Sequence, residues 1–287
     1  MKLLFWLVTT DHLADKIWFK DDEDFKIAMN IVAVLAASMN LKVISFILMS
    51  NHVHFVLWCD RNVADEFITR FKKLFSQHYS GKYGTCEFLK GNKVDIRPLV
   101  IGDESFERGV AYVIMNSVAA KICLHPSQYP WGTGNTFFNS TPPAGKRAGD
   151  YSLRARRALL HSKLPVPDSY LINDRGFVEP SSYVPVEFVE SVFRSPKRLQ
   201  WFLNNSSKAR RLNESAEAPS FNDQLIASAI DNLTVSLFRK SGIGALDEAQ
   251  CAELFRQIRY RFSSDPAQMA RVTGIPYEKV CALLESI

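Results

Sequence analysis

The stretch from Leu41 to Trp58 reads LKVISFILMSNHVHFVLW, and it decides the fold. Most of its residues are apolar and strand-forming, and Met49–Asn51 interrupts the run, which predicts two strands joined by a tight connection. Alternate side chains of a strand point to the same face. His52 and His54 therefore share one face of the second strand, and Val53 lies on the other.

Two imidazoles side by side provide two of the ligands that a divalent metal needs. The alternative is that both histidines are ordinary polar residues on a solvated sheet face, which is the better interpretation of a lone histidine. A His-x-His pair inside so apolar a strand favours the metal site. The spacing does not fix the metal, because two imidazoles also suit zinc.

The composition is that of a soluble globular protein. The 287 residues are 47% apolar and 23% charged, which allows one large domain or two to three small ones. A net charge of +5 permits a nucleic-acid partner without requiring one. The five scattered cysteines predict a reducing compartment, the cytoplasm, and no structural zinc. No segment is apolar for long enough to predict a membrane span, and the apolar start is expected to be a strand rather than a signal peptide.

The elements around the histidine strands follow a known order. We expect a strand at Leu4–Thr9, a helix from about Asp21 to Met39, a second helix over Val63–Tyr79 and a fourth strand at Lys93–Leu99. The order β-α-β-β-α-β predicts an α+β, ferredoxin-like domain, with an antiparallel four-stranded sheet and two helices on one face. In that topology the first and third strands are central, so the two histidines lie in the middle of the sheet.

A third helix is expected from about Asp103 to Cys123. Its apolar residues share one side at about 100° per residue. Tyr112 and Asn116 are spaced i, i+4 and share a face roughly opposite the apolar one. A merely structural tyrosine would more often lie in the apolar stripe. We therefore expect another surface to cover this pair, and the open face of the sheet is the obvious candidate.

Three segments together resemble a known family. MSNHVHFVL at 49–57 resembles the HUH motif (His, hydrophobic, His) of the single-tyrosine transposases. YVIMNSVAA at 112–120 is similar to their tyrosine helix, in the form found in REP-associated tyrosine transposases, and YPWGT at 129–133 is similar to the Tyr-Pro-Trp-Ser-Ser that closes their domain. The chain departs from the family pattern at Ser117, where Pro is usual, and at Gly132, where Ser is usual.

The resemblance covers about residues 1–138 and implies a metal-dependent endonuclease and strand transferase for single-stranded or hairpin DNA. His52, His54 and the Asn116 amide oxygen would bind Mg²⁺ or Mn²⁺, which would polarise a phosphate oxygen. Tyr112 would attack phosphorus and hold the DNA as a 5′-phosphotyrosine, leaving a free 3′-OH. The family includes monomers and dimers, so the resemblance leaves the oligomeric state open.

Two alternatives to this interpretation remain. Tyr79 could be the nucleophile, although it lacks a polar partner four residues further on. The chain could also be a non-catalytic, sequence-specific DNA-binding regulator derived from a transposase. The complete set of two histidines, tyrosine and asparagine favours the enzyme.

The remainder of the chain divides into two parts. Residues 139–219 are expected to be an accessory segment with linkers, and the sequence suggests no mechanism for them. Residues 220–287 are expected to form a helical domain. Its end, Pro266–Leu284, resembles a helix-turn-helix in which Tyr277 and Lys279 would begin the recognition helix. A plain helical hairpin is the alternative, because so short a motif also arises by chance.

Basic side chains outside the motifs are further candidate DNA contacts. Arg70 and Lys73 lie off the apolar stripe of the second helix, and Arg97 lies in the fourth strand. A basic helix face is usually just solvated, so these residues become DNA contacts only in combination with the other motifs.

Overall fold

The structure is a computed structural model that describes residues 4–13, 16–207, 223–262 and 264–285 of the chain. Its first part is built on one antiparallel four-stranded sheet in the order β2-β3-β1-β4. The strands are β1 (Leu4–Thr10), β2 (Lys42–Met49), β3 (His52–Cys59) and β4 (Val94–Leu99). The two central strands are thus β3 and β1, and the α+β class expected from the sequence agrees with the structure.

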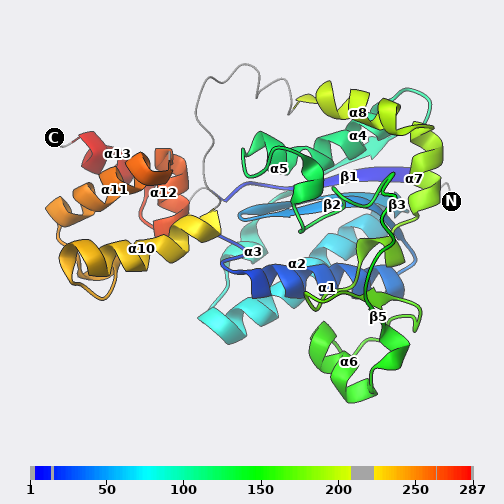
Figure 1. Ribbon diagram of the computed structural model, residues 1–287, viewed down its shortest axis with the longest axis horizontal. Helices are drawn as coiled ribbons and strands as arrows, with labels where there is room; N and C mark the ends of the chain where they lie inside the picture. Colours follow the sequence, from blue (N-terminus) through cyan, green and yellow to red (C-terminus); the bar gives the residue numbers. More distant parts are fainter. Residues whose placement is uncertain (1–3, 14–15, 208–222, 263, 286–287) are drawn as a thin grey trace.

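Helices cover both faces of this sheet. Two of them, α1 (Asp22–Ser38) and α2 (Arg61–Tyr83), lie on one face, and α4 (Ser105–Ile114) lies on the other with α8 (Pro196–Asn204) packed outside it (Figure 1). Because both faces are covered, β2 and β3 are buried along almost their whole length. This explains why the sequence there is a nearly continuous apolar run rather than an alternating one.

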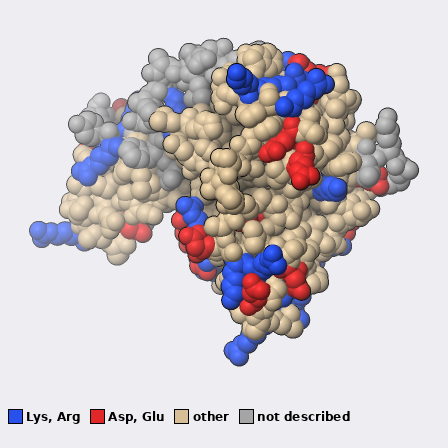
Figure 2. All heavy atoms as spheres, turned by 45° about the vertical axis from the view of Figure 1, so that its right-hand side comes forward, with Lys and Arg blue, Asp and Glu red and all other residues tan. Residues whose placement is uncertain are grey.

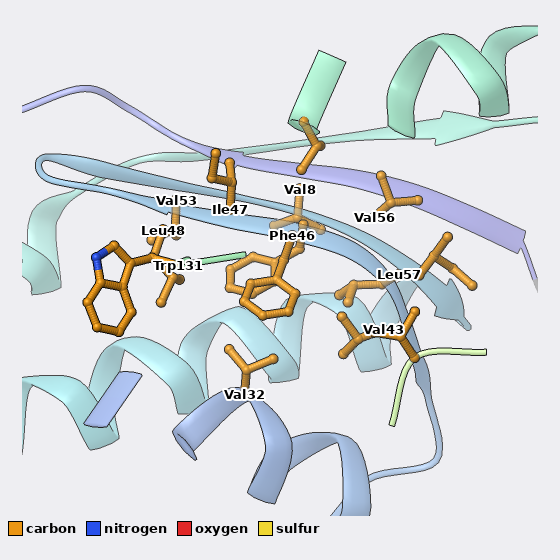
Figure 3. Close-up of a cluster of buried hydrophobic side chains, with 14 of the residues drawn as sticks. Val8, Val32, Val43, Phe46, Ile47, Leu48, Val53, Val56, Leu57 and Trp131 are labelled. Atoms are coloured by element: carbon orange, nitrogen blue, oxygen red, sulfur yellow. The ribbon is translucent and has the colours of Figure 1, made fainter. Parts of the chain in front are cut away.

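The core between the sheet and α1 continues to Trp131 (Figure 3). The indole stacks on Phe25 of α1, with ring centroids 5.0 Å apart. The backbone beside Trp131 pairs with the edge strand β2, since Leu48 N donates to Trp131 O at 2.9 Å and Thr133 N donates to Phe46 O at 3.0 Å. The YPWGT segment therefore covers an edge that would otherwise expose unpaired backbone groups.

Gly132 lies where this segment comes closest to β2. A Cβ at Gly132 would be 2.5 Å from Phe46 O and 3.0 Å from Ile47 Cα, both of them backbone atoms. A side chain there would force the two backbones apart. The glycine that departs from the family pattern is thus explained by the close approach of the two segments.

The predicted third helix is shorter than expected and interrupted. Instead of one helix over Asp103–Cys123, α4 ends at Ile114, and a four-residue helix, α5 (Asn116–Ala119), follows Met115. The side chain of Asn116 explains the interruption. Its Nδ2 donates to Tyr112 O at 2.8 Å and to Val113 O at 3.3 Å, so the amide competes with the backbone for helix carbonyls.

Residues 139–207 pack closely onto the first part of the chain. Their elements are β5 (Lys146–Arg147), α6 (Leu153–Leu160), β6 (Leu171–Ile172), α7 (Val186–Phe193) and α8. Val189, Phe193 and Phe202 are buried in the same hydrophobic core as the sheet. Asn30 of α1 also joins the two parts, because its Oδ1 accepts from Val178 N and its Nδ2 donates to Gly176 O. This segment therefore helps to enclose the core.

The end of the chain forms a helical unit, which we call the C-terminal module. It consists of α10 (Asp223–Phe238), α11 (Glu248–Phe262), α12 (Pro266–Thr273) and α13 (Tyr277–Glu285). These helices enclose a hydrophobic cluster of their own that includes Ile230, Phe255 and Leu283. Gly274 ends α12 with φ 71°, a left-handed conformation that glycine adopts without strain. Within the described residues, no helix combines the length and apolar character needed to cross a bilayer.

The close approach at Gly132 generates a prediction about stability. Gly132→Ala should lower the free energy of unfolding by about 2 kcal/mol, because the added Cβ overpacks a backbone contact. The matched control is Gly81→Ala in α2, where a Cβ meets nothing within 4 Å. There the substitution should be neutral or stabilising by up to about 1 kcal/mol. Urea unfolding followed by circular dichroism measures both, and equal free energies for the two variants would contradict the packing argument.

Candidate functional site

The two histidines of β3 lie on the sheet face that α4 covers. His54 is opposite Thr9 in the pairing of β3 with β1. Val53 and Phe55 alternate with the histidines and point to the other face of the sheet. There Phe55 packs against Phe67 of α2 with ring centroids 5.0 Å apart. His54 is 0% and His52 4% exposed. They are therefore not polar residues of a solvated sheet face.

A third histidine, which the sequence analysis missed, completes a cluster. The ligand atoms of His12, His52 and His54 all lie within 4.8 Å of one another. The His12 ring stacks on the His52 ring, with centroids 3.6 Å apart and planes 23° apart. Nitrogens bound to one metal ion at about 2.1 Å lie roughly 3–4 Å apart, so small side-chain rotations would bring the three donors together.

The position of His12 follows from the pairing of the two central strands. β1 ends at Thr10 and runs antiparallel to β3, so the residues just beyond it lie beside the start of β3. The feature of the sequence that could have indicated His12 is therefore its position two residues after the end of β1. That signal is useful only once the register between β1 and β3 is known.

Hydrogen bonds orient the imidazoles of β3. His52 Nδ1 lies 2.8 Å from Asn51 Oδ1, and Asn51 Nδ2 donates to Leu13 O at 2.8 Å, which fixes the orientation of the amide. An amide oxygen only accepts, so Nδ1 of His52 carries the hydrogen, and Nε2 is the nitrogen whose lone pair can bind a metal. His54 Nδ1 lies 3.1 Å from Thr9 Oγ1. Such bonds typically hold metal-binding histidines in one tautomer and orientation.

The structure places Tyr112 next to this cluster. Its ring lies edge-on to His54, with centroids 5.3 Å apart and planes at 87°. The side chain is half-buried on α4, between the helix and the sheet. Tyr112 is thus covered by the sheet face that carries the two histidines of β3.

Asn116 is buried at the start of α5, and the helix holds its Nδ2. Oδ1 is therefore the atom of this amide that could bind a metal, and its role as a ligand remains a prediction. Tyr79, the alternative nucleophile, is not brought to the histidines. It is 7% exposed on α2, on the opposite face of the sheet, where it packs against Phe75 and Tyr83.

The five candidate DNA contacts lie on α2, β4 and α13. Arg70 and Arg97 are exposed and pair with nearby acids, with Arg70 Nη2 2.6 Å from Glu66 and Arg97 Nε 2.5 Å from Asp95. Tyr277 and Lys279 are exposed at the start of α13. On the face shown in Figure 2, basic side chains occur in small groups beside acidic ones.

Lys73 is different, because it lines a groove of about 700 Å³ between α2 and α3 (Phe88–Gly91). Ile68 and Leu89 are buried apolar residues of the groove, and Lys72 and Lys90 also line it, with no carboxylate among its lining residues. Burial lowers the pKa of Lys72, whose Nζ donates to Asn92 O at 2.5 Å. The groove suits a ligand that combines an apolar part with negative charge.

Comparisons with known proteins add little to this geometry. No protein-family model and no curated protein matches the sequence. Among solved structures, the chain is similar to a REP-associated tyrosine transposase bound to a REP hairpin, with a TM-score of 0.34 and 11% sequence identity. The similarity covers 46% of this chain and 78% of the transposase chain.

The three-histidine cluster generates a prediction about metal binding. Wild-type protein should bind one Mn²⁺ or Zn²⁺ per chain in isothermal titration calorimetry. His12→Ala should weaken that binding by at least about tenfold, as should His52→Ala, because each removes one of three donors. His125→Ala, which removes an exposed histidine outside the cluster, is the control and should bind as wild type does. Unchanged affinity in His12→Ala would remove this residue from the site.

Proposed function

We propose that the chain is a metal-dependent endonuclease and strand transferase for single-stranded or hairpin DNA, of the single-tyrosine HUH type. The observation that carries the proposal is the meeting of Tyr112 with the histidine cluster on one covered face of the sheet. In this proposal residues 1–138 are a ferredoxin-like catalytic domain with an added tyrosine-bearing helix. Residues 139–219 are accessory, residues 220–287 contain a DNA-binding helix-turn-helix, and the protein works in the cytoplasm.

The donor set fits a divalent cation. His52, His54 and His12 would hold it, and Asn116 Oδ1 would be a further ligand. A bound cation would supply Lewis acidity at a phosphate oxygen. Three imidazoles suit Mn²⁺ or Zn²⁺ better than Mg²⁺, which prefers oxygen ligands, so within the pair Mg²⁺ or Mn²⁺ we propose Mn²⁺.

Tyr112 is the proposed nucleophile. Its phenolic oxygen forms a bond to phosphorus as the bond between phosphorus and the 3′-oxygen breaks, and the departing oxygen takes up a proton to become a free 3′-OH. The phenol loses its own proton in the same step. Because the ring is held against His54, the oxygen is confined to the neighbourhood of the donor cluster. Attack of a 3′-OH on the phosphotyrosine would reverse the bond changes and rejoin strands.

Two features support DNA as the partner. The groove between α2 and α3 offers lysines and apolar surface together, which suits a nucleotide with its base and its phosphate. In the C-terminal module, α12 and α13 are joined by a short turn, and α13 begins with exposed side chains. That second feature also suits the alternative function, a regulator that binds DNA without cutting it.

A covalent-adduct experiment separates the enzyme from the regulator. Incubation with end-labelled single-stranded DNA and Mn²⁺, followed by a denaturing gel, should give a shifted protein–DNA band with wild-type protein. Tyr112→Phe removes one oxygen and little packing, so the fold should persist while the band disappears. Tyr79→Phe is the matched control and should keep the band. A band that persists in Tyr112→Phe and vanishes in Tyr79→Phe would assign the nucleophile to the other tyrosine.

The groove generates a separate prediction about DNA affinity. The double variant Lys73→Glu/Lys90→Glu should bind single-stranded DNA more weakly. The dependence of affinity on salt should also become less steep by about one contact per lysine lost. Lys163→Glu/Lys197→Glu changes the net charge equally at exposed positions outside the groove and is the control. Fluorescence anisotropy over a range of salt concentrations measures both variants, and equal losses would show a general charge effect.

A further inference from the structure

One buried carboxylate of the C-terminal module bonds the turn between β2 and β3. Asp223, the first residue of α10, is 3% exposed. Its carboxylate accepts hydrogen bonds from Ser50 Oγ at 2.5 Å, from Gln268 Nε2 at 2.9 Å and from Arg271 Nε and Nη2 at 3.1 and 3.3 Å. A single side chain thereby joins α10, α12 and the turn between β2 and β3.

A buried carboxylate is costly unless charges and hydrogen bonds compensate for it. Gln268 and Arg271 belong to the module itself, and Arg271 provides the positive charge in a two-bond contact. Ser50 belongs to the other part of the chain. Side chains of the module therefore fix the position of the Asp223 carboxylate, and the carboxylate in turn fixes the position of the Ser50 hydroxyl.

Ser50 lies next to a residue that bonds one of the histidines of the candidate metal centre. It directly precedes Asn51, whose amide bonds His52 Nδ1 and the Leu13 carbonyl beside His12. Its own carbonyl accepts from Trp18 N at 2.7 Å and from Phe19 N at 3.2 Å. Ser50 is therefore held by Asp223 at its side chain and by Trp18 and Phe19 at its backbone, and the residue that follows it orients His52.

We propose that Asp223 is a positioning residue for the metal centre, acting through Ser50 and Asn51, so that the docked C-terminal module sets the affinity of the histidines for metal. This inference deepens the proposed function and rests on it for the identity of the site. The proposal also implies that ligand binding by the C-terminal module and metal binding by the histidines affect each other reciprocally. A ligand of the module that changes the affinity of the site for metal must have its own affinity changed by metal to the same extent. Because Arg271 and Gln268 lie on α12, DNA bound to α12 and α13 would act on the same carboxylate.

The test is metal binding by the full chain, with Mn²⁺ as the probe in isothermal titration calorimetry. Ser50→Ala removes the hydroxyl and should weaken Mn²⁺ binding by about tenfold, the smaller of the effects seen when groups behind metal ligands are removed. Ser50→Thr keeps a hydroxyl and should restore most of the affinity. Asp223→Asn should behave as Ser50→Ala does or more severely.

Gln224→Ala is the matched control for docking. Gln224 is the next residue of α10, and its Nε2 donates to Phe19 O at 2.6 Å, so it holds the module to the same part of the chain without bonding the Ser50 side chain. This variant should bind Mn²⁺ within about twofold of wild type. Wild-type affinity in Ser50→Ala, or equal losses in Ser50→Ala and Gln224→Ala, would overturn the proposal.

A second measurement separates this inference from the proposed function. Histidine ring resonances in metal-free protein report the His52 Nδ1 hydrogen bond directly, and they should change in Ser50→Ala but not in Gln224→Ala. Wild-type protein that binds no Mn²⁺ but shows this pattern would refute the metal-dependent function and keep the positioning role. His52 resonances that are the same in Ser50→Ala and wild type would refute the positioning role, whether or not the protein binds Mn²⁺.

Discussion

The register between β1 and β3 is the constraint on which the site depends. With Thr9 opposite His54, the chain beyond β1 comes beside His52 and brings His12 with it. A slip of one residue would turn both histidines of β3 to the face of α2, which is filled by phenylalanines. The buried hydroxyl of Thr10 helps to hold the register, since it accepts from Val53 N at 3.0 Å.

Much of this arrangement could be predicted from the sequence, and the missing parts have physical reasons. The period of two places His52 and His54 on one face, and Asp21 marks the start of α1, where its side chain accepts from Asp24 N. His12 could not be found in that way, because it meets His52 only through the pairing of two strands that are distant in sequence. Nor does apolar periodicity reveal the end of α4, which depends on the hydrogen bonds that one asparagine side chain makes with helix carbonyls.

Separate parts of the chain meet at one end of the sheet. Figure 1 shows α3 and the start of α10 toward the end of the sheet where β2 turns into β3. The histidine cluster contains the first residue of β3, residues around α3 line the groove, and Asp223 at the start of α10 bonds Ser50 in the turn before β3. Asn92 joins two of them, because its carbonyl accepts from Lys72 of the groove and its Nδ2 donates to Asp11 O, one residue before His12. Two hydrogen bonds through Asn92 therefore connect Lys72 of the groove to Asp11, the residue before His12.

The segment that covers β2 has a consequence for self-association. One outer strand of the sheet is already paired with residues 131–133, and the other, β4, is short and contains Pro98, which has no N–H to donate. Neither border is suited to continue into a sheet shared with a second molecule. If two copies of this chain associate, we expect them to meet through side chains of helices or loops rather than through a shared sheet.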